Sequence, residues 1–243
     1  MMNKEITMTD RENIMTHLMV LLQARQNNFF VIPGNERRRV VSEYRTIVQN
    51  NYFVGAQPET LHKEKISKLY KSEYSVTDKA DGERAFLVID QNGSVYFMDN
   101  NLNKVFKTDI ASCKLEDSNQ EEDTSSTLST LSSCNENSKK LYYSTVIDGE
   151  LVKHDNKIYF LAFDILAYNK RDLRGNQEYD LRKRLNRLDH IVKTLSQSKY
   201  YVISVKHYYF GNVFSGSKKI LDSVGEKFYE NDGLIFTPIK VLN

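Results

Sequence analysis

The first part of the chain carries apolar residues at helical spacing. Thr9-x-x-Glu12 has the form of a capping box, and the apolar positions that follow it predict a helix to about Arg25 with one buried face. A second helix is expected after Pro33-Gly34, and a short third one over 58–70. Residues 1–72 are therefore predicted to form a helical part. The apolar positions of the first helix are Ile14, Met15, Leu18, Met19 and Leu22.

From Glu73 onward the pattern alternates with a period of two, which indicates strands. Gln91-Asn92-Gly93 is a strong hairpin signal between two of them. Helices are predicted over Asp180–Leu195 and Ser217–Glu230. The pattern favours an α+β fold with antiparallel sheets flanked by helices. The predicted strands are Tyr74–Lys79, Arg84–Asp90, Ser94–Asp99, Tyr142–Asp148, Glu150–Lys153, Lys157–Leu166, Tyr200–Tyr209 and Gly233–Thr237.

The stretch Ser112–Ser138 interrupts this pattern. It holds eight Ser, three Thr and six acidic residues against one Lys, without a helical or strand period. Such a composition predicts a disordered insertion. Without it, Lys and Arg number 33 instead of 34 and Asp and Glu 26 instead of 32, so the net charge rises from +2 to +7. That charge suits a polyanionic partner such as a nucleotide or RNA, and ordinary surface lysines explain it equally well.

Several classes of protein are disfavoured by composition. The 243 residues are 40% hydrophobic and 27% charged, and the longest apolar run near the start, Leu18–Leu22, is far shorter than a membrane span. The two cysteines and five histidines show no spacing typical of zinc ligands or of a disulfide framework. We expect a soluble intracellular protein without a membrane partner. The sequence does not distinguish nucleus, cytoplasm and virion.

Four polar turns at the ends of apolar strands carry the candidate chemistry. The first, Lys79-Ala80-Asp81-Gly82-Glu83-Arg84, places a lysine beside an acidic turn, where it is a candidate nucleophile or phosphate ligand. Taken alone, a polar hairpin turn explains it as well. The others follow in order and predict a convergent site: Ile147–Val152 (IDGELV), Tyr159–Leu166 (YFLAFDIL) and Asn231–Phe236 (NDGLIF).

These four segments resemble motifs I, III, IIIa and IV of the covalent nucleotidyltransferase superfamily. That superfamily includes ATP-dependent DNA ligases, RNA ligases and mRNA capping guanylyltransferases, and its catalytic domain has an ATP-grasp-like fold. The match spans roughly 57–238, and Asp232–Pro238 (DGLIFTP) is most similar to the capping branch. Met98–Asn101 resembles capping proteins of large DNA viruses, which lack a ribose-contacting arginine there.

The resemblance implies a role for each matched residue. Lys79 would attack the α-phosphate of GTP, with Asp81 setting its environment, and burial, Arg84 and a divalent cation would lower its pKa. Arg84 and Glu150 would contact the sugar, Phe163 would stack on the base, and Thr77 and Asp78 would line the base pocket. Mg²⁺ or Mn²⁺ would be held by Glu150 and Asp232.

For three residues, alternatives remain open. Lys206 either reaches a phosphate or is a snorkelling edge lysine. Asp148 is either catalytic or satisfies turn amides. Phe163 could also be a core aromatic residue.

The expected activity is an mRNA guanylyltransferase that forms a lysyl-GMP intermediate and transfers GMP to 5′-diphosphate RNA. The family's motif V lysines and OB-fold are expected to be missing after Asn243. An OB-fold domain, an RNA triphosphatase or a methyltransferase are the corresponding partners. An ATP-dependent DNA or RNA ligase adenylation domain, and a catalytically incomplete nucleotide-binding module, are the alternatives.

Overall fold

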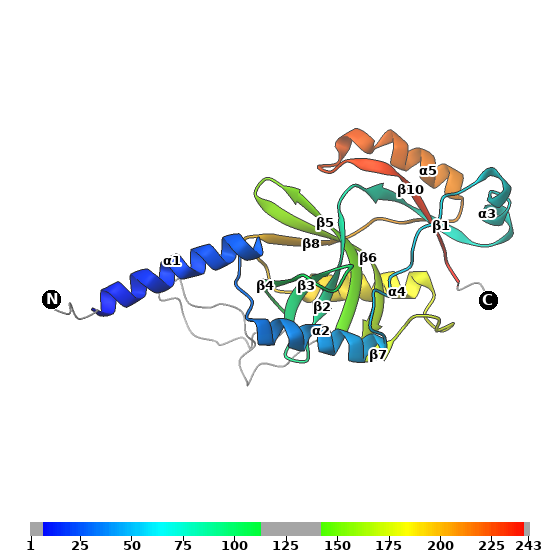
Figure 1. Ribbon diagram of the computed structural model, residues 1–243. Coiled ribbons are helices and arrows are strands. Elements are labelled where there is room, and N and C mark those ends of the chain that lie inside the picture. The colour runs from blue at the N-terminus through cyan, green and yellow to red at the C-terminus, as the bar shows by residue number, and fades with distance from the viewer. Residues whose placement is uncertain (1–6, 113–141, 241–243) are drawn as a thin grey trace, which may run out of the picture.

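The computed structural model describes residues 7–112 and 142–240 (Figure 1). The predicted insertion lies outside the described residues except for Ser112. That residue is buried, and its hydroxyl accepts a hydrogen bond from the Tyr142 N–H at 3.1 Å, so it belongs to the folded body. The helical elements are α1 (Met8–Gln26), α2 (Gly34–Val48), η1 (Lys63–Lys65), α3 (Lys68–Lys71), α4 (Leu181–Thr194), α5 (Val213–Asp222) and η2 (Val224–Glu226).

The strands form two sheets. A seven-stranded sheet has the order β4-β3-β2-β5-β6-β7, with β8 pairing to β6, and a three-stranded sheet has the order β10-β1-β9. The strands are β1 (Tyr74–Ala80), β2 (Glu83–Ile89), β3 (Ser94–Asp99), β4 (Val105–Ala111), β5 (Thr145–His154), β6 (Lys157–Tyr168), β7 (Arg171–Asp172), β8 (Tyr201–Val205), β9 (Tyr209–Phe210) and β10 (Asn231–Pro238).

The predicted α+β class with antiparallel sheets flanked by helices is confirmed, and one pair of strands is parallel. Strands β6 and β8 are parallel, because α4 supplies the crossover that parallel neighbours require. The predicted strand Tyr200–Tyr209 is in fact two strands that lie in different sheets. Strand β4 was not predicted, since its Lys107 and Asp109 obscure the alternation.

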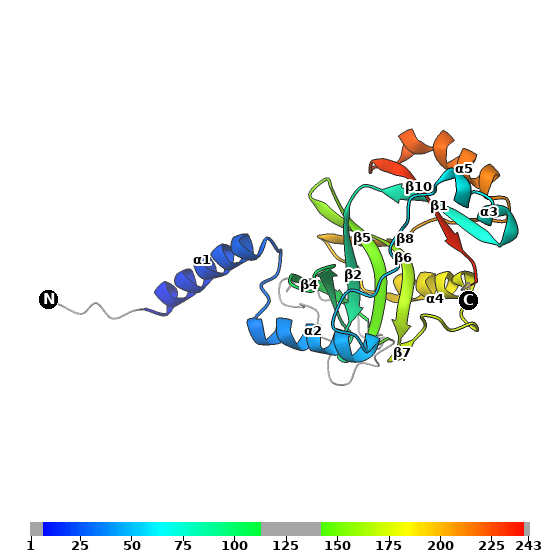
Figure 2. The same cartoon turned by 45° about the vertical axis from the view of Figure 1, so that its right-hand side comes forward.

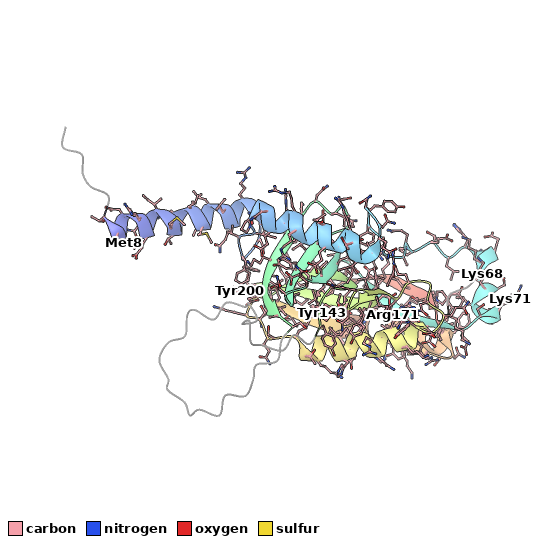
Figure 3. The ribbon with its side chains drawn as sticks, turned by 90° about the horizontal axis from the view of Figure 1, so that it is seen from below. Met8, Lys68, Lys71, Tyr143, Arg171 and Tyr200 are labelled. Atoms are coloured by element: carbon pink, nitrogen blue, oxygen red, sulfur yellow. The ribbon has the colours of Figure 1, made fainter. Side chains whose placement is uncertain are left out.

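The large sheet is covered on both faces, as Figure 3 shows with α2 and α4 on opposite sides. Alternate residues of β2 point to opposite faces: Leu87 packs with α4, whereas Phe86 packs with α2. This explains why β2 reads as a continuous apolar run instead of an alternating one. The helix residues that close the two cores are Val40, Tyr44, Ile47 and Val48 of α2 and Leu181, Leu185, Leu188 and Ile191 of α4.

Helix α1 differs from its prediction in two ways. Its N-cap is Thr7, whose hydroxyl accepts from the Asp10 N–H at 3.2 Å, so the capping box is Thr7-x-x-Asp10 and not Thr9-x-x-Glu12. None of its residues is buried, and Ile14 and Leu18 are 59% and 45% exposed. The helix extends away from the body in Figures 1 and 2. The expected buried face is therefore wrong for this chain.

Two further boundaries differ from the prediction. The third helix, expected over 58–70, is reduced to η1 and α3. The helix expected over Ser217–Glu230 begins at Val213, because the Asn212 side chain caps it by accepting from the N–H groups of Phe214 and Ser215, and it ends at Asp222. The last strand and the β2–β3 hairpin are found where they were predicted.

Gly149 on β5 is required by packing, which gives a first testable expectation. A Cβ at this position would lie 2.3 Å from Cζ of the buried Phe160 ring, so Gly149→Ala forces that ring out of place. We expect a loss of roughly 1–3 kcal/mol in the free energy of unfolding, measured by urea denaturation. Gly225→Ala is the matched control, since nothing lies within 4 Å of a Cβ there. Equal effects of the two variants would contradict this packing argument.

Candidate active site

Lys79 lies at an irregularity where β1 pairs with β10. The register shifts between Asp78 and Ala80, and Gly233 opposite has φ +118, a conformation that favours glycine. The Asn231 side chain supports the distortion by accepting from the Gly233 N–H at 3.0 Å. The consequence is a direct contact between two predicted site residues: Lys79 Nζ donates to Asp232 Oδ2.

The hydrogen bond to Asp232 raises the pKa of Lys79, and the charges of Asp232, Glu150 and Asp81 act in the same direction. Burial lowers it less, because the Lys79 side chain is 40% exposed. Burial lowers this pKa as predicted, but the hydrogen bond and charge of Asp232 outweigh it in the nucleotide-free protein. Lys79 is held here as a protonated amine, and it must lose that proton before it can act as a nucleophile.

Glu150 lies beside this lysine on β5, opposite Arg84 in the register. Partial burial raises the pKa of its carboxyl group, against the opposing effects of Lys206, Lys79, the Gly82 N–H and Arg84. Gly82 has no room for a side chain, since a Cβ would lie 2.8 Å from Glu150 Cγ. The Asp81-Gly82 turn thus packs directly against β5, and Glu150 is surrounded by cationic groups.

Arg84 and Asp148 form a bidentate ion pair, with Nε–Oδ1 at 3.1 Å and Nη2–Oδ2 at 2.7 Å. The Asp148 side chain is 1% exposed, so this carboxylate is fully desolvated. The guanidinium carbon lies 4.9 Å from the ring centroid of Phe53 and 5.3 Å from that of Phe163. Asp148 thus pairs with Arg84 and also interacts with the backbone of Gly149, and the Arg84 guanidinium lies against the Phe163 ring.

Backbone from the loop before β1 covers this ion pair. A Cβ on Gly55 would lie 2.5 Å from Asp148 Oδ2 and 2.6 Å from Arg84 Nη2. Neither Phe53 nor Gly55 was predicted as part of the site. The loop around them holds several apolar residues, and the sequence gives no signal that these two contact a distant ion pair.

Burial raises the pKa of Asp148 to about 6, against the lowering effects of Arg84. The unfolded chain releases this proton near the ordinary value of 3.8. The folded protein thus binds more protons between about pH 4 and 6, and its free energy of unfolding falls as the pH rises through that window. The fall amounts to a few kcal/mol, since one pKa unit corresponds to about 1.4 kcal/mol.

Asp148→Asn should flatten this part of the stability profile. Denaturant titrations at pH 4.5 and 7.5 measure the change, and Asp189→Asn, which alters an exposed i,i+4 pair with Lys193, is the control. Parallel profiles of wild type and Asp148→Asn would show that the buried carboxyl does not titrate in this range.

Asp78 lies in a second buried cluster with two lysines. Lys206 Nζ donates to the Asp78 carbonyl at 2.5 Å and lies 3.5 Å from Oδ2, while Lys227 Nζ lies 3.0 Å from Oδ1. Burial raises the pKa of Asp78, but Lys206, Lys227 and a bond from Tyr229 more than offset it and leave it below its ordinary value. Burial lowers the pKa of Lys206 despite Asp78 and Glu150. Lys206 is 7% exposed, so it is not a snorkelling lysine.

The remaining predicted residues lie around these two clusters. Thr77 donates its hydroxyl proton to the His207 carbonyl at 2.8 Å, beside Asp78. Asp81 is exposed, and its N–H donates to the Glu230 carbonyl at 2.9 Å. The structure thus brings Lys79, Asp232, Glu150, Arg84 and Phe163 together, and Glu150 connects them electrostatically with Lys206.

Two side chains near the site were not predicted from the sequence: Arg184 on α4, and Tyr208 between β8 and β9. Arg184 forms a bidentate pair with Asp164 at 2.8 and 3.1 Å, and the Tyr208 hydroxyl donates to the Phe163 carbonyl at 3.0 Å. Both contacts hold the β6 segment that carries Phe163. Arg184 is one of several basic residues on α4, and the sequence gives no signal that separates it from its solvated neighbours.

Glu150 and Asp232 are the residues predicted to hold a divalent cation. In residues 7–112 and 142–240, no group of three or more His, Cys, Asp or Glu is arranged to hold a metal ion. Glu150 and Asp232 both interact with Lys79, however, and two carboxylates are the usual protein share of a magnesium site completed by phosphates.

Comparison with known proteins places the chain in a family. The family described as "mRNA capping enzyme, catalytic domain" matches residues 28–242. A probable mRNA-capping enzyme of Acanthamoeba polyphaga mimivirus is 26% identical over 190 residues, covering 77% of this chain and 14% of that protein. The mRNA-capping enzyme subunit alpha of Kluyveromyces lactis is 29% identical over 216 residues. This match covers 78% of this chain and 41% of that protein.

Solved structures of DNA ligases also align with the chain. A Lig E DNA ligase gives a TM-score of 0.43 at 17% identity, covering 78% of this chain and 63% of that one. A mycobacterial DNA ligase D gives a TM-score of 0.41 at 15% identity, and the alignment covers 70% of this chain and 49% of that one.

The chain belongs to the mRNA capping enzyme catalytic domain family. The predicted family membership is thus confirmed. The chain spans about a seventh and two fifths of the two capping relatives. Within the described residues, no helix is both long and apolar enough to cross a membrane.

Proposed function

We propose that the protein is an mRNA guanylyltransferase that forms a covalent GMP adduct on Lys79 and passes the GMP to the 5′-diphosphate end of RNA. The observation that carries the proposal is the juxtaposition of Lys79 with Asp232, Glu150 and Arg84 in a chain of the capping family. Lys79, Glu150 and Asp232 come from three different motifs. Lys79 and Asp232 lie in the three-stranded sheet and Glu150 in the seven-stranded one, so their proximity depends on the fold.

In the first step the amine of Lys79 attacks the α-phosphorus of GTP. A bond forms between Nζ and phosphorus, the bond from phosphorus to the bridging oxygen of the β-phosphate breaks, and pyrophosphate leaves. Asp232 Oδ2 already accepts a hydrogen bond from Nζ, and it is the nearest group to take the proton. A divalent cation held by Glu150, Asp232 and phosphate oxygens would neutralise the charge that develops on the phosphates.

Arg84 and Phe163 are placed to hold the nucleoside. The guanidinium is fixed by Asp148 and lies against the Phe163 ring, so a sugar hydroxyl can bind Arg84 while the base stacks on Phe163. Thr77, Asp78 and the buried Lys206 form the adjoining polar wall of this nucleotide site. Such preorganised groups lower the cost of orienting GTP for in-line attack.

In the second step a terminal oxygen of diphosphate-ended RNA attacks the same phosphorus. The bond from phosphorus to Nζ breaks and the Lys79 amine regains a proton. The chain covers only part of the length of its capping relatives. An OB-fold domain, or an RNA triphosphatase or methyltransferase, is the partner that the family resemblance implies for cap synthesis.

Incubation with α-labelled GTP or ATP and Mg²⁺ or Mn²⁺, followed by denaturing electrophoresis, tests the proposal. We expect a labelled protein band with GTP and none with ATP. Labelling with ATP alone would instead support a ligase adenylation domain. Nucleotide binding without any adduct would support a catalytically incomplete module.

A further inference from the structure

A cluster of aromatic side chains lies beside the candidate active site. Phe228 packs against Tyr159 with ring centroids 4.3 Å apart, against His154 at 5.3 Å and against Tyr229 at 5.0 Å. Phe228 is nevertheless 39% exposed. We call these four residues the rim cluster.

The rim cluster joins two segments that are distant in the sequence. His154 and Tyr159 belong to the β5–β6 hairpin, which continues beyond the last β2 pairing at Leu151. Phe228 and Tyr229 lie in the segment that leads into β10. In both Figures 1 and 2 the tip of the hairpin lies beside the start of β10.

Direct packing connects the rim cluster with the catalytic turn. Tyr159 and Tyr229 pack on a small core made of Ala80, Val152 and Leu161. Ala80 follows Lys79 directly, and a Cβ on Gly82 would lie 3.0 Å from Val152 Cγ2. The exposed ring of Phe228 is therefore separated from the Lys79–Gly82 turn by a single layer of side chains.

Lysines lie in both segments of the rim cluster. Lys153 and Lys157 are exposed on the hairpin, and Lys227 Nζ lies 5.4 Å from the Tyr229 ring centroid. Carboxylates contact the same groups: Asp155 pairs with His154 at 3.1 Å, and Asp78 pairs with Lys227 at 3.0 Å. An exposed aromatic surface between lysines is the combination that binds single-stranded nucleic acid, because rings stack on bases while lysines attract the phosphates.

We propose that the rim cluster is a binding site for the acceptor RNA, in which a base near the 5′ end stacks on Phe228. This inference rests on the proposed guanylyltransferase function and adds a subsite to it. The stacked base would orient the diphosphate end toward the GMP on Lys79. Since every base has a π face, the site should tolerate any sequence.

Binding of a fluorescein-labelled single-stranded RNA decamer with a 5′-diphosphate, followed by anisotropy with the full chain, tests the proposal. Phe228→Ala should weaken binding roughly 5- to 100-fold, the range of one lost base stack. Phe228→Trp should restore it. Phe214→Ala is the matched control, since Phe214 is 44% exposed and stacks on Tyr70 at 5.2 Å.

An abasic scan separates stacking from a general structural effect. Replacing one of the first four nucleotides by an abasic site should weaken binding to the wild type at one position, and Phe228→Ala should add nothing further there. Binding that is unchanged in Phe228→Ala, or lost equally in Phe214→Ala, would overturn the inference and leave the rim cluster as a contact for another partner. So would a wild type that does not bind the RNA.

Adduct formation with GTP alone is measured in parallel. Phe228→Ala should form the GMP adduct at the wild-type rate, because Phe228 lies outside the nucleotide site. A wild type that binds RNA through Phe228 but forms no adduct would contradict the proposed function and not the RNA site. A wild type that forms the adduct but binds RNA independently of Phe228 would contradict the RNA site and not the proposed function.

Discussion

Lys79→Ala is expected to abolish the covalent GMP adduct completely, and Lys79→Arg to abolish it equally. Lys79 is the lysine that the fold places against Asp232 and Glu150, and removal of its amine removes the nucleophile. A guanidinium stays protonated at any accessible pH and cannot attack phosphorus. The measurement is transfer of label from α-labelled GTP to the protein, quantified at saturating nucleotide.

Lys65→Ala is the matched control for that loss. The Lys65 side chain is 41% exposed and pairs with Glu59, so it resembles Lys79 in exposure and in having a carboxylate partner. It should label like the wild type. Both Lys79 variants should also unfold at wild-type denaturant concentrations, because an ion pair this exposed contributes about 0–1 kcal/mol. Adduct persisting at the wild-type level in Lys79→Ala would remove this residue as the nucleophile.

Arg84→Ala is expected to destabilise the fold by about 3–5 kcal/mol at pH 7.5. The substitution leaves the Asp148 carboxylate buried without its partner, which is the costly way to break a buried ion pair. Out of a total stability of roughly 5–15 kcal/mol, this is a large fraction. Urea denaturation followed by far-UV circular dichroism measures it.

Two variants make this second expectation specific. Arg171→Ala disrupts an exposed pair with Glu178 and should change stability by less than about 1 kcal/mol. The double variant Arg84→Met/Asp148→Leu should recover most of the loss, because it removes both charges together. If Arg84→Ala and Arg171→Ala lowered stability equally, the ion pair would not be the buried contact described above.

The sequence predicted the strands that carry the site better than it predicted what surrounds them. Strands β2, β3 and β10 are found near their predicted bounds, because their apolar runs end at polar turns with glycine. The pairing of β6 with β8 was not predictable, since it depends on a crossover and not on a local pattern. Helix α1 has an apolar face that no other part of the described chain covers, and periodicity alone cannot reveal this.

Within the site, the sequence likewise predicted which residues are close together better than it predicted their surroundings. Motif resemblance identified residues that prove to be neighbours, such as Lys79 and Asp232. It did not predict their electrostatic state, because the pKa of Lys79 depends on a partner across the sheet. The contacts of Phe53, Lys227 and Arg184 were also missed, since each joins segments far apart in the chain.

Peptide mapping can identify the lysine that receives GMP from GTP, which we propose is Lys79. The wild type is incubated with GTP and Mg²⁺ or Mn²⁺, digested with trypsin under non-acidic conditions and analysed by mass spectrometry. We expect one GMP on the peptide Ser72–Arg84, which remains uncleaved at Lys79 because the modified lysine is no longer a trypsin site. GMP on any other lysine, with this peptide cleaved and unmodified, would contradict it.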